Sequence, residues 1–240
     1  MNRLAIVVAS FAFLAAGPVA AASLSVTPIG IERIAPAASA ALTLRNTGDR
    51  AINVQVRVFR WSQSGGDDVL EKTSDVVVSP PMTSLAPGVD YTVRVVRIAK
   101  TPLVGEESYR VLVDELPDRS ARADSAIQLV VRYSIPAFFR APGIGEPEVA
   151  WQARASGGRI QLSAENSGAT RLKAGRTVIR DSGGREIVLS EGLLGYVLGG
   201  AARGWSLPSG GKKLKAGAAE LEITSDGVTT NVPITIRAGG

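Results

Sequence analysis

The chain of 240 residues contains neither cysteine nor histidine. Without cysteine no disulfide can hold the fold together, so its stability must come from a packed core. Without histidine, Ser-His-Asp and Cys-His catalysis are excluded, and so is the commonest zinc ligand. The acidic residues are scattered, and Asp67-Asp68 lies in a Gly-Gly-Asp-Asp segment typical of a solvated turn. We therefore expect no enzyme activity, no metal and no cofactor.

Long apolar runs are scarce, and the one that exists lies at the start of the chain. Met1-Asn2-Arg3 precedes an apolar run from Leu4 to Ala16, and small residues follow as far as Ala22. This pattern predicts a secretory signal peptide over residues 1–22, because the run is shorter than the roughly 18 to 20 residues of a membrane anchor. After cleavage we expect a periplasmic chain without an integral membrane segment.

The charge of the chain indicates little about its partners. The formal net charge is +5, and removal of Arg3 with the signal peptide would lower it to +4. Such a mild basic balance suits acidic protein partners but is too diffuse to indicate nucleic acid binding.

Short β-branched segments separated by Gly, Pro, Asn and Asp dominate the rest of the chain, and no helical period extends beyond a turn or two. This pattern predicts an all-β protein. In the first half it predicts seven strands, the number in an immunoglobulin-like sandwich. They cover about residues 23–33, 39–46, 51–62, 69–78, 89–99, 107–115 and 125–138.

Two prolines and two glycines interrupt the strand pattern within residues 141–147, which predicts a linker. We expect an N-terminal domain over 23–140 and a C-terminal domain over 148–240. Residues 41–48 are echoed by 160–168, and both segments end in an Asn-Ser/Thr-Gly turn. Either the two domains share a duplicated architecture or the echo is a chance similarity.

Several sequence segments, by their residues and their order along the chain, resemble those of the PapD-like periplasmic chaperones of chaperone-usher pilus assembly. They are Leu42-Thr43-Leu44-Arg45-Asn46, Leu85-Ala86-Pro87-Gly88 followed by Val93-Arg94, Glu107 to Pro117, and Ile127 to Ile135 running into Pro136-Ala137-Phe138-Phe139-Arg140. Val-Thr-Pro at 26–28 and Tyr-Ser-Ile-Pro at 133–136 are similar to the archaic, spore-coat-type branch. The resemblance implies two immunoglobulin-like β-sandwich domains in an L-shaped (boomerang) arrangement.

In this family the last strand of the first domain completes the fold of a pilus subunit that lacks a strand. The resemblance implies that this donor strand uses one row of alternate side chains, formed by Ile127, Leu129, Val131 and Tyr133. An ordinary sandwich strand would show the same row. The preceding polar loop, 117–125, is either an extension of the donor strand or a flexible hairpin.

Classical members of the family bind the C-terminal carboxylate of the subunit with an arginine and a lysine. Here Gly30 and Pro136 occupy those two positions, so the classical site cannot be carried over. Each of four other arginines is either a substitute or an ordinary surface residue. These are Arg33, Arg94, Arg97 and Arg132.

The resemblance also implies a salt-bridge cluster between the domains, formed by Glu107, Arg140 and Asp226. An arginine can join two carboxylates through its planar fork of donors, so such a cluster would fix the angle between the domains. The alternative is three solvated charges.

We expect a chaperone that binds and stabilises pilus subunits by donor-strand complementation and delivers them to an outer-membrane usher. One alternative is a pilus subunit or another secreted immunoglobulin-like binding or structural protein without chaperone activity. Another is a protein of the same fold that binds some other exported polypeptide. Without a subunit, the donor strand could cap itself in a dimer.

Overall fold

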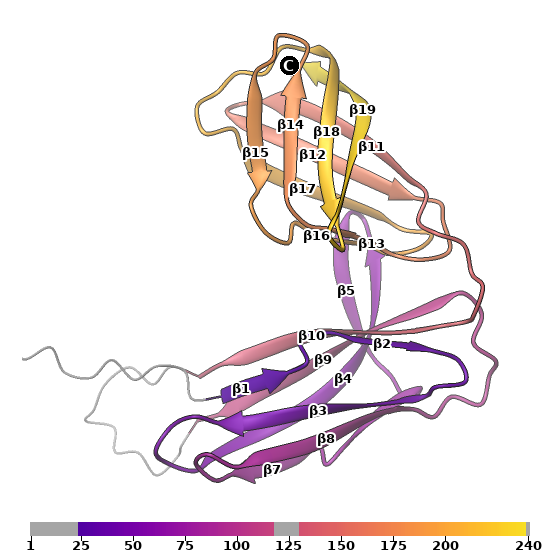
Figure 1. Cartoon of the computed structure of the whole chain (residues 1–240), viewed down its shortest axis with the longest axis vertical. Coiled ribbons are helices and arrows are strands. Elements are labelled where there is room, and N and C mark those ends of the chain that lie inside the picture. The colour runs from indigo at the N-terminus through magenta and orange to yellow at the C-terminus, as the bar shows by residue number, and fades with distance from the viewer. Residues whose placement is uncertain (1–23, 118–129, 239–240) are drawn as a thin grey trace, which may run out of the picture.

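The computed structural model describes residues 24–117 and 130–238. Within these ranges every regular element is a β-strand, so the all-β prediction is confirmed. Figure 1 shows two β-sandwich bodies whose long axes lie at an angle, which gives the molecule the expected L shape. The strands of the first body lie within residues 24–140 and those of the second within residues 149–238.

The first body is a sandwich of two sheets. One sheet has the order β1-β3-β8-β6, and the other has the order β2-β10-β9-β4-β5 with β7 paired to β4. The strands are β1 (Leu24–Thr27), β2 (Ile31–Ile34), β3 (Ser39–Asn46), β4 (Ile52–Ser64), β5 (Asp67–Lys72), β6 (Val76–Ser79), β7 (Met82–Leu85), β8 (Asp90–Arg97), β9 (Glu106–Leu116) and β10 (Arg132–Arg140).

Two of the seven predicted strands are divided in the structure. The segment 23–33 forms β1, which pairs with β3, and β2, which pairs with β10 in the opposite sheet. Pro28, which has no N–H for a ladder, lies between them. The segment 69–78 likewise forms β5 and β6, and β7 was not predicted at all. The predicted start of the last strand, at residue 125, lies outside the described residues.

The second body contains a seven-stranded sheet in the order β15-β14-β18-β19-β11-β12-β17 and the pair β13-β16. Its strands are β11 (Val149–Ser156), β12 (Arg159–Asn166), β13 (Leu172–Ala174), β14 (Thr177–Asp181), β15 (Glu186–Ser190), β16 (Gly195–Val197), β17 (Ala202–Pro208), β18 (Gly217–Ser225) and β19 (Val228–Ala238).

The echoed segments of the two domains make the same contacts. Asn46 is fully buried, and its side-chain amide donates to the carbonyls of Arg50 (2.6 Å) and Leu85 (3.0 Å). Asn166, also buried, donates to the carbonyls of Thr170 (2.8 Å) and Val197 (3.1 Å). Each asparagine oxygen accepts the amide two residues later. This shared hydrogen bonding supports a duplicated architecture.

Each body has its own core, and a third, smaller cluster joins them. Alternate apolar residues of β3, β8, β9 and β10 fill the first core, and those of β12, β14, β18 and β19 fill the second. The third cluster consists of Trp61, Phe138, Tyr196 and Leu198, and therefore includes residues from both bodies. This cluster forms part of the junction between the two domains.

Candidate functional site

The last strand of the first body has an open edge. β10 pairs antiparallel with β9 along its whole length. On its other side, the parallel ladder with β2 begins only at Ala137. Among the described residues, 132–136 therefore have no strand partner on this side. Such an edge is a template for strand addition.

The ladder with β9 decides which peptide groups face the open edge. The Glu115 amide donates to the Val131 carbonyl (2.9 Å), so Val131 turns its carbonyl toward β9. Because peptide groups alternate along an antiparallel strand, those of Arg132 and Ser134 face the open edge. Pro136 faces the same way, but proline has no N–H to leave unpaired.

The predicted donor row is only partly described. Ile127 and Leu129 lie outside the described residues, as does most of the polar loop that precedes them. Val131 is half-buried, and Tyr133 packs against the core of its own domain and donates its hydroxyl to the Leu24 carbonyl (2.7 Å). The described part of the row therefore lies on the inner face of the sandwich.

An aromatic cluster lies where β10 meets the second domain. The Trp61 ring centroid is 5.8 Å from that of Phe138 and 5.5 Å from that of Tyr196. Leu198 completes the cluster, and its backbone amide donates to the Gln63 side-chain oxygen (2.9 Å). The side-chain amide of Gln63 in turn donates to the Tyr196 carbonyl (2.8 Å). The junction thus combines ring packing with hydrogen bonds between the domains.

Arg110 stacks on this cluster without forming an ion pair among the described residues. It lies opposite Pro136 in the β9–β10 ladder, and its guanidinium carbon is 3.7 Å from the Trp61 ring centroid and 5.7 Å from that of Tyr196. It also donates a long hydrogen bond to the Ser134 carbonyl (3.5 Å). Burial lowers the pKa of the Arg110 guanidinium, while the charge of Asp68 opposes that shift.

Arg171 joins the second domain to two carboxylates of the first. Its guanidinium bonds the carboxylates of Glu106 and Glu32, and its backbone amide donates to Glu106 Oε1 (3.1 Å). The guanidinium carbon also lies 3.6 Å from the Phe138 ring centroid. The Glu106 side chain is only 2% exposed, so the ion pair between Arg171 and Glu106 is shielded from water.

The predicted cluster of Glu107, Arg140 and Asp226 does not form. Glu107 binds Arg97 within the first domain, and Asp226 accepts a hydrogen bond from Lys173 within the second (3.0 Å). Arg140 forms no ion pair in the part of the chain that the structure describes. An acid-arginine-acid cluster does join the domains, but Arg171 supplies the arginine. Strand alternation is the physical reason: neighbouring Glu106 and Glu107 point to opposite faces of β9, and Glu106 faces the second domain.

A hairpin of the first domain makes a second contact with the other domain. Figure 1 shows β5 rising from the first body toward the second. At its turn, the Gly66 carbonyl accepts hydrogen bonds from the Arg203 guanidinium (2.7 Å) and the Gly204 amide (3.2 Å). Arg203 also pairs with Asp67 (3.3 Å) and Asp68 (3.6 Å). The two domains are therefore braced at two places.

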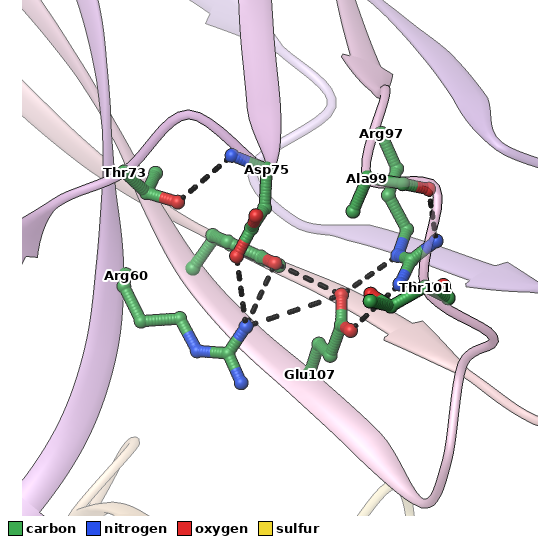
Figure 2. Close-up of polar contacts among 8 residues, drawn as sticks. Arg60, Thr73, Asp75, Arg97, Ala99, Thr101 and Glu107 are labelled. Carbon is green, nitrogen blue, oxygen red and sulfur yellow. Dashed lines mark hydrogen bonds and ion pairs between the residues drawn. The ribbon is translucent and has the colours of Figure 1, made fainter.

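Glu107 is the centre of a polar network inside the first domain (Figure 2). Its carboxylate accepts two hydrogen bonds from Arg97 (2.7 and 2.8 Å) and one from the Tyr109 hydroxyl (2.9 Å). Arg60 approaches the same carboxylate at 4.0 Å and also pairs with Asp75 (3.7 Å). Burial raises the pKa of Glu107, but the hydrogen bonds and charge of Arg97 and Tyr109 outweigh it and hold that pKa below its ordinary value.

The structure places the four predicted anchor arginines in different surroundings. Arg97 is used by Glu107, and Arg132 pairs with Asp114, whose pKa its hydrogen bond helps to lower against the effect of burial. Arg33 donates to the carbonyls of Ser39 and Glu32, at 2.7 Å each. Arg94 is exposed on β8, in the opposite sheet from β10. The structure does not bring these four residues together.

The described residues contain no group of three or more His, Cys, Asp or Glu side chains arranged to hold a metal ion. Over the same ranges there is no helix of the length and apolarity needed to cross a membrane.

The last strand of the first immunoglobulin-like sandwich has an open edge, and this sandwich is held at an angle to a second one, which defines a two-domain immunoglobulin-like protein. A family model described as "Pili and flagellar-assembly chaperone, PapD N-terminal domain" matches residues 23–145, just over half of the chain. The chain belongs to this family of pilus-assembly chaperones. The prediction of a PapD-like chaperone is confirmed.

Solved structures agree with this assignment. A chain in the CsuC–CsuE chaperone–tip adhesion subunit complex from the archaic Csu pili of Acinetobacter baumannii is 25% identical, with a TM-score of 0.68, over 90% of this chain and 99% of that one. The E. coli chaperone DraB is 22% identical, with a TM-score of 0.57, over 89% and 96% of the two chains. A chain in the Salmonella enterica SafA pilin–SafB chaperone complex is 19% identical, with a TM-score of 0.60, over 91% and 97%. A search of curated proteins gives no match.

Proposed function

We propose that the protein is a periplasmic, non-catalytic chaperone that binds pilus subunits by strand addition at β10 and passes them to an outer-membrane usher. The open edge at residues 132–136 carries this proposal, since an extended segment bound there would satisfy the outward peptide groups of Arg132 and Ser134. This chain is similar to chains in the Csu and Saf complexes, each of which contains a chaperone and a subunit, and this similarity supports the proposal.

Main-chain hydrogen bonds at this edge would tolerate many subunit sequences. Ile127, Leu129 and Val131 of the predicted row would add apolar contacts, at about 1.5–3 kcal/mol for each fully buried large side chain. Tyr133, the fourth member, packs against the core of its own domain. Part of this gain is lost in ordering the two segments. In the absence of a subunit, the same edge would pair with a second copy of the chain.

Co-purification with candidate pilus subunits tests strand addition. We expect the wild type to retain a subunit one-to-one, and a Leu129→Asp, Val131→Asp double variant to lose it because two charges would enter the apolar row. Val130→Asp is the matched control, since Val130 belongs to the opposite row and its side chain is already 49% exposed. A folded double variant that binds as well as the control would refute strand addition.

Arg110 is our proposed anchor for the C-terminal carboxylate of the subunit, in place of the four arginines named from the sequence. It lies opposite Pro136, at the inner end of the open edge, and no described carboxylate pairs with it. A partly buried guanidinium without a counter-ion favours an anionic ligand, because charge-assisted hydrogen bonds are strongest where water is scarce.

Binding of a subunit to an Arg110→Met variant tests the anchor. We expect affinity to fall about thirtyfold, which corresponds to about 2 kcal/mol for a hydrogen bond to a charged group. Arg94→Met is the control, because Arg94 is exposed on the other sheet. The loss should disappear for a subunit whose C-terminal carboxylate is amidated. If Arg110→Met weakens both forms of the subunit equally, Arg110 does not bind the carboxylate.

A further inference from the structure

The second domain also ends in a strand with an open edge. β19 pairs with β18 from Val228 to Ile236, but its parallel ladder with β11 covers only Ile236–Ala238. Over residues 228–235, no described strand lies on the free side of β19. The first four residues of the strand are exposed. Figure 1 shows β18 and β19 as a hairpin whose turn lies toward the first domain.

The turn of this hairpin decides which peptide groups are free. Asp226 and Gly227 have positive φ angles of 46° and 85° and form a two-residue turn. The closing pair of such a turn is hydrogen-bonded, so the alternate peptide groups of Thr229 and Asn231 point away from β18. Pro233 also faces outward, as Pro136 does on β10, and has no N–H. The free edge thus offers two unpaired peptide groups next to the turn.

A groove continues from this edge along the outer face of the domain. One cavity of about 370 Å³ lies where β11 and β19 part, and its lining includes Trp151, Pro233 and Thr235. A second, of about 470 Å³, extends to the Gly65-Gly66 turn of the first domain. Gln152 and Arg237 line both cavities, which joins them into one groove.

The groove carries uncompensated positive charge. Arg154 and Arg237 are exposed and lie in register on neighbouring strands. Like charges in such positions destabilise a sheet, and neither arginine forms an ion pair in the described ranges. Asp67 is the one acid among the lining residues, and it already pairs with Arg203. A ligand with carboxylates would relieve this repulsion.

We propose that the free edge of β19 binds an extended, acidic segment of a partner protein as an added strand. The peptide groups of Thr229 and Asn231 bond its main chain, and Arg154 and Arg237 bind its carboxylates. This site is separate from the open edge of β10, so a subunit and the acidic partner bind at the same time. Charge complementarity selects the partner, because the main-chain bonds accept many sequences.

Amide hydrogen exchange of the purified protein, measured by NMR, tests the site. The probe is an eight-residue peptide of alternating threonine and valine that ends in two aspartates, and the control peptide ends in two lysines. We expect the acidic peptide to slow exchange at the amides of Thr229 and Asn231 at least tenfold, and the lysine peptide to leave it unchanged. Equal protection by both peptides, or protection by neither, overturns the proposal.

Two variants separate what the main-chain groups of β19 and what the two arginines contribute to peptide binding. Asn231→Pro removes one outward N–H without breaking the ladder to β18, whereas Asn231→Ala keeps that N–H and is its control. We expect only the proline variant to bind the acidic peptide at least tenfold more weakly. An Arg154→Glu, Arg237→Glu variant should prefer the lysine peptide. If the amides become protected at high protein concentration without peptide, the edge binds a second copy and the proposal is wrong.

Discussion

Two arginines at the domain junction stack on aromatic rings, but only one of them is neutralised. Arg171 lies 3.6 Å from the Phe138 ring centroid and binds the carboxylates of Glu106 and Glu32. Arg110 lies 3.7 Å from the Trp61 ring centroid and forms no ion pair in the described part of the chain. The first arginine therefore uses its charge within the molecule, whereas the second keeps its charge for a ligand.

This difference gives the two arginines different roles at the domain junction. A buried ion pair contributes little net stability but is costly to break, so Arg171 resists any motion that separates the domains. A stacked guanidinium without a counter-ion is tolerated because its ring contacts offset part of the desolvation. We infer that the fixed angle between the domains keeps Tyr196, which belongs to the second domain, over Arg110.

The largest effect should follow from Arg171→Met. Removing the guanidinium leaves the nearly inaccessible Glu106 carboxylate with only a backbone donor, so we expect the free energy of unfolding to fall by about 3–5 kcal/mol. Urea denaturation followed by circular dichroism measures the change. Small-angle X-ray scattering should also show a wider distribution of domain angles.

Two further variants decide whether the buried charge causes this loss. Adding Glu106→Gln to Arg171→Met should restore part of the stability, because no buried charge would then remain unpaired. Arg176→Met removes the two ion pairs of Arg176 with Glu191 and Glu222, whose side chains are all at least partly exposed, and should cost less than about 1 kcal/mol. A loss at Arg171 no greater than that at Arg176 would contradict the assigned role.

A smaller effect is expected from Glu107→Gln, which removes the charge that Arg97 compensates. At pH 7 the variant should be less stable by about 1.5–3 kcal/mol, the usual range for hydrogen bonds to charged groups. The folded-state pKa of Glu107 is lowered, so its contribution is complete above the unfolded-state pKa of about 4.3 and is lost as the pH falls through the folded-state value. Urea denaturation at pH 7 and pH 3 should show the difference shrinking. A constant difference would contradict this assignment.

The sequence predicted best what depends on local pattern. Alternation predicted β3 at residues 39–46 with its observed bounds, and the echoed asparagines, Asn46 and Asn166, make the same hydrogen bonds. Where a strand changes sheet, local pattern gave the wrong result. Residues 23–33 are apolar enough for one strand, but Pro28 interrupts the ladder and the two halves join different sheets.

The junction was less predictable because its contacts join distant positions. Arg171 meets Glu32 across 139 positions and Glu106 across 65, and no spacing rule connects them. Glu107 rather than Glu106 was expected in the cluster, an error of one residue that strand alternation turns into an error of face. Arg110 was missed because its rings come from β4 and the second domain. Its register opposite Pro136 was the one signal that could have identified it.

The smallest effect on stability should follow from Arg110→Met, which makes the comparison with Arg171 sharpest. The substitution leaves no described carboxylate unpaired and keeps an unbranched side chain against Trp61. We therefore expect the free energy of unfolding to fall by only about 1 kcal/mol, because losing the cation–π contacts of this partly buried guanidinium is offset in part by removing an unpaired charge. Urea denaturation beside Arg171→Met measures both variants under the same conditions. A loss at Arg110 as large as that at Arg171 would mean that Arg110 holds the junction together, and its charge would then not be free for a ligand.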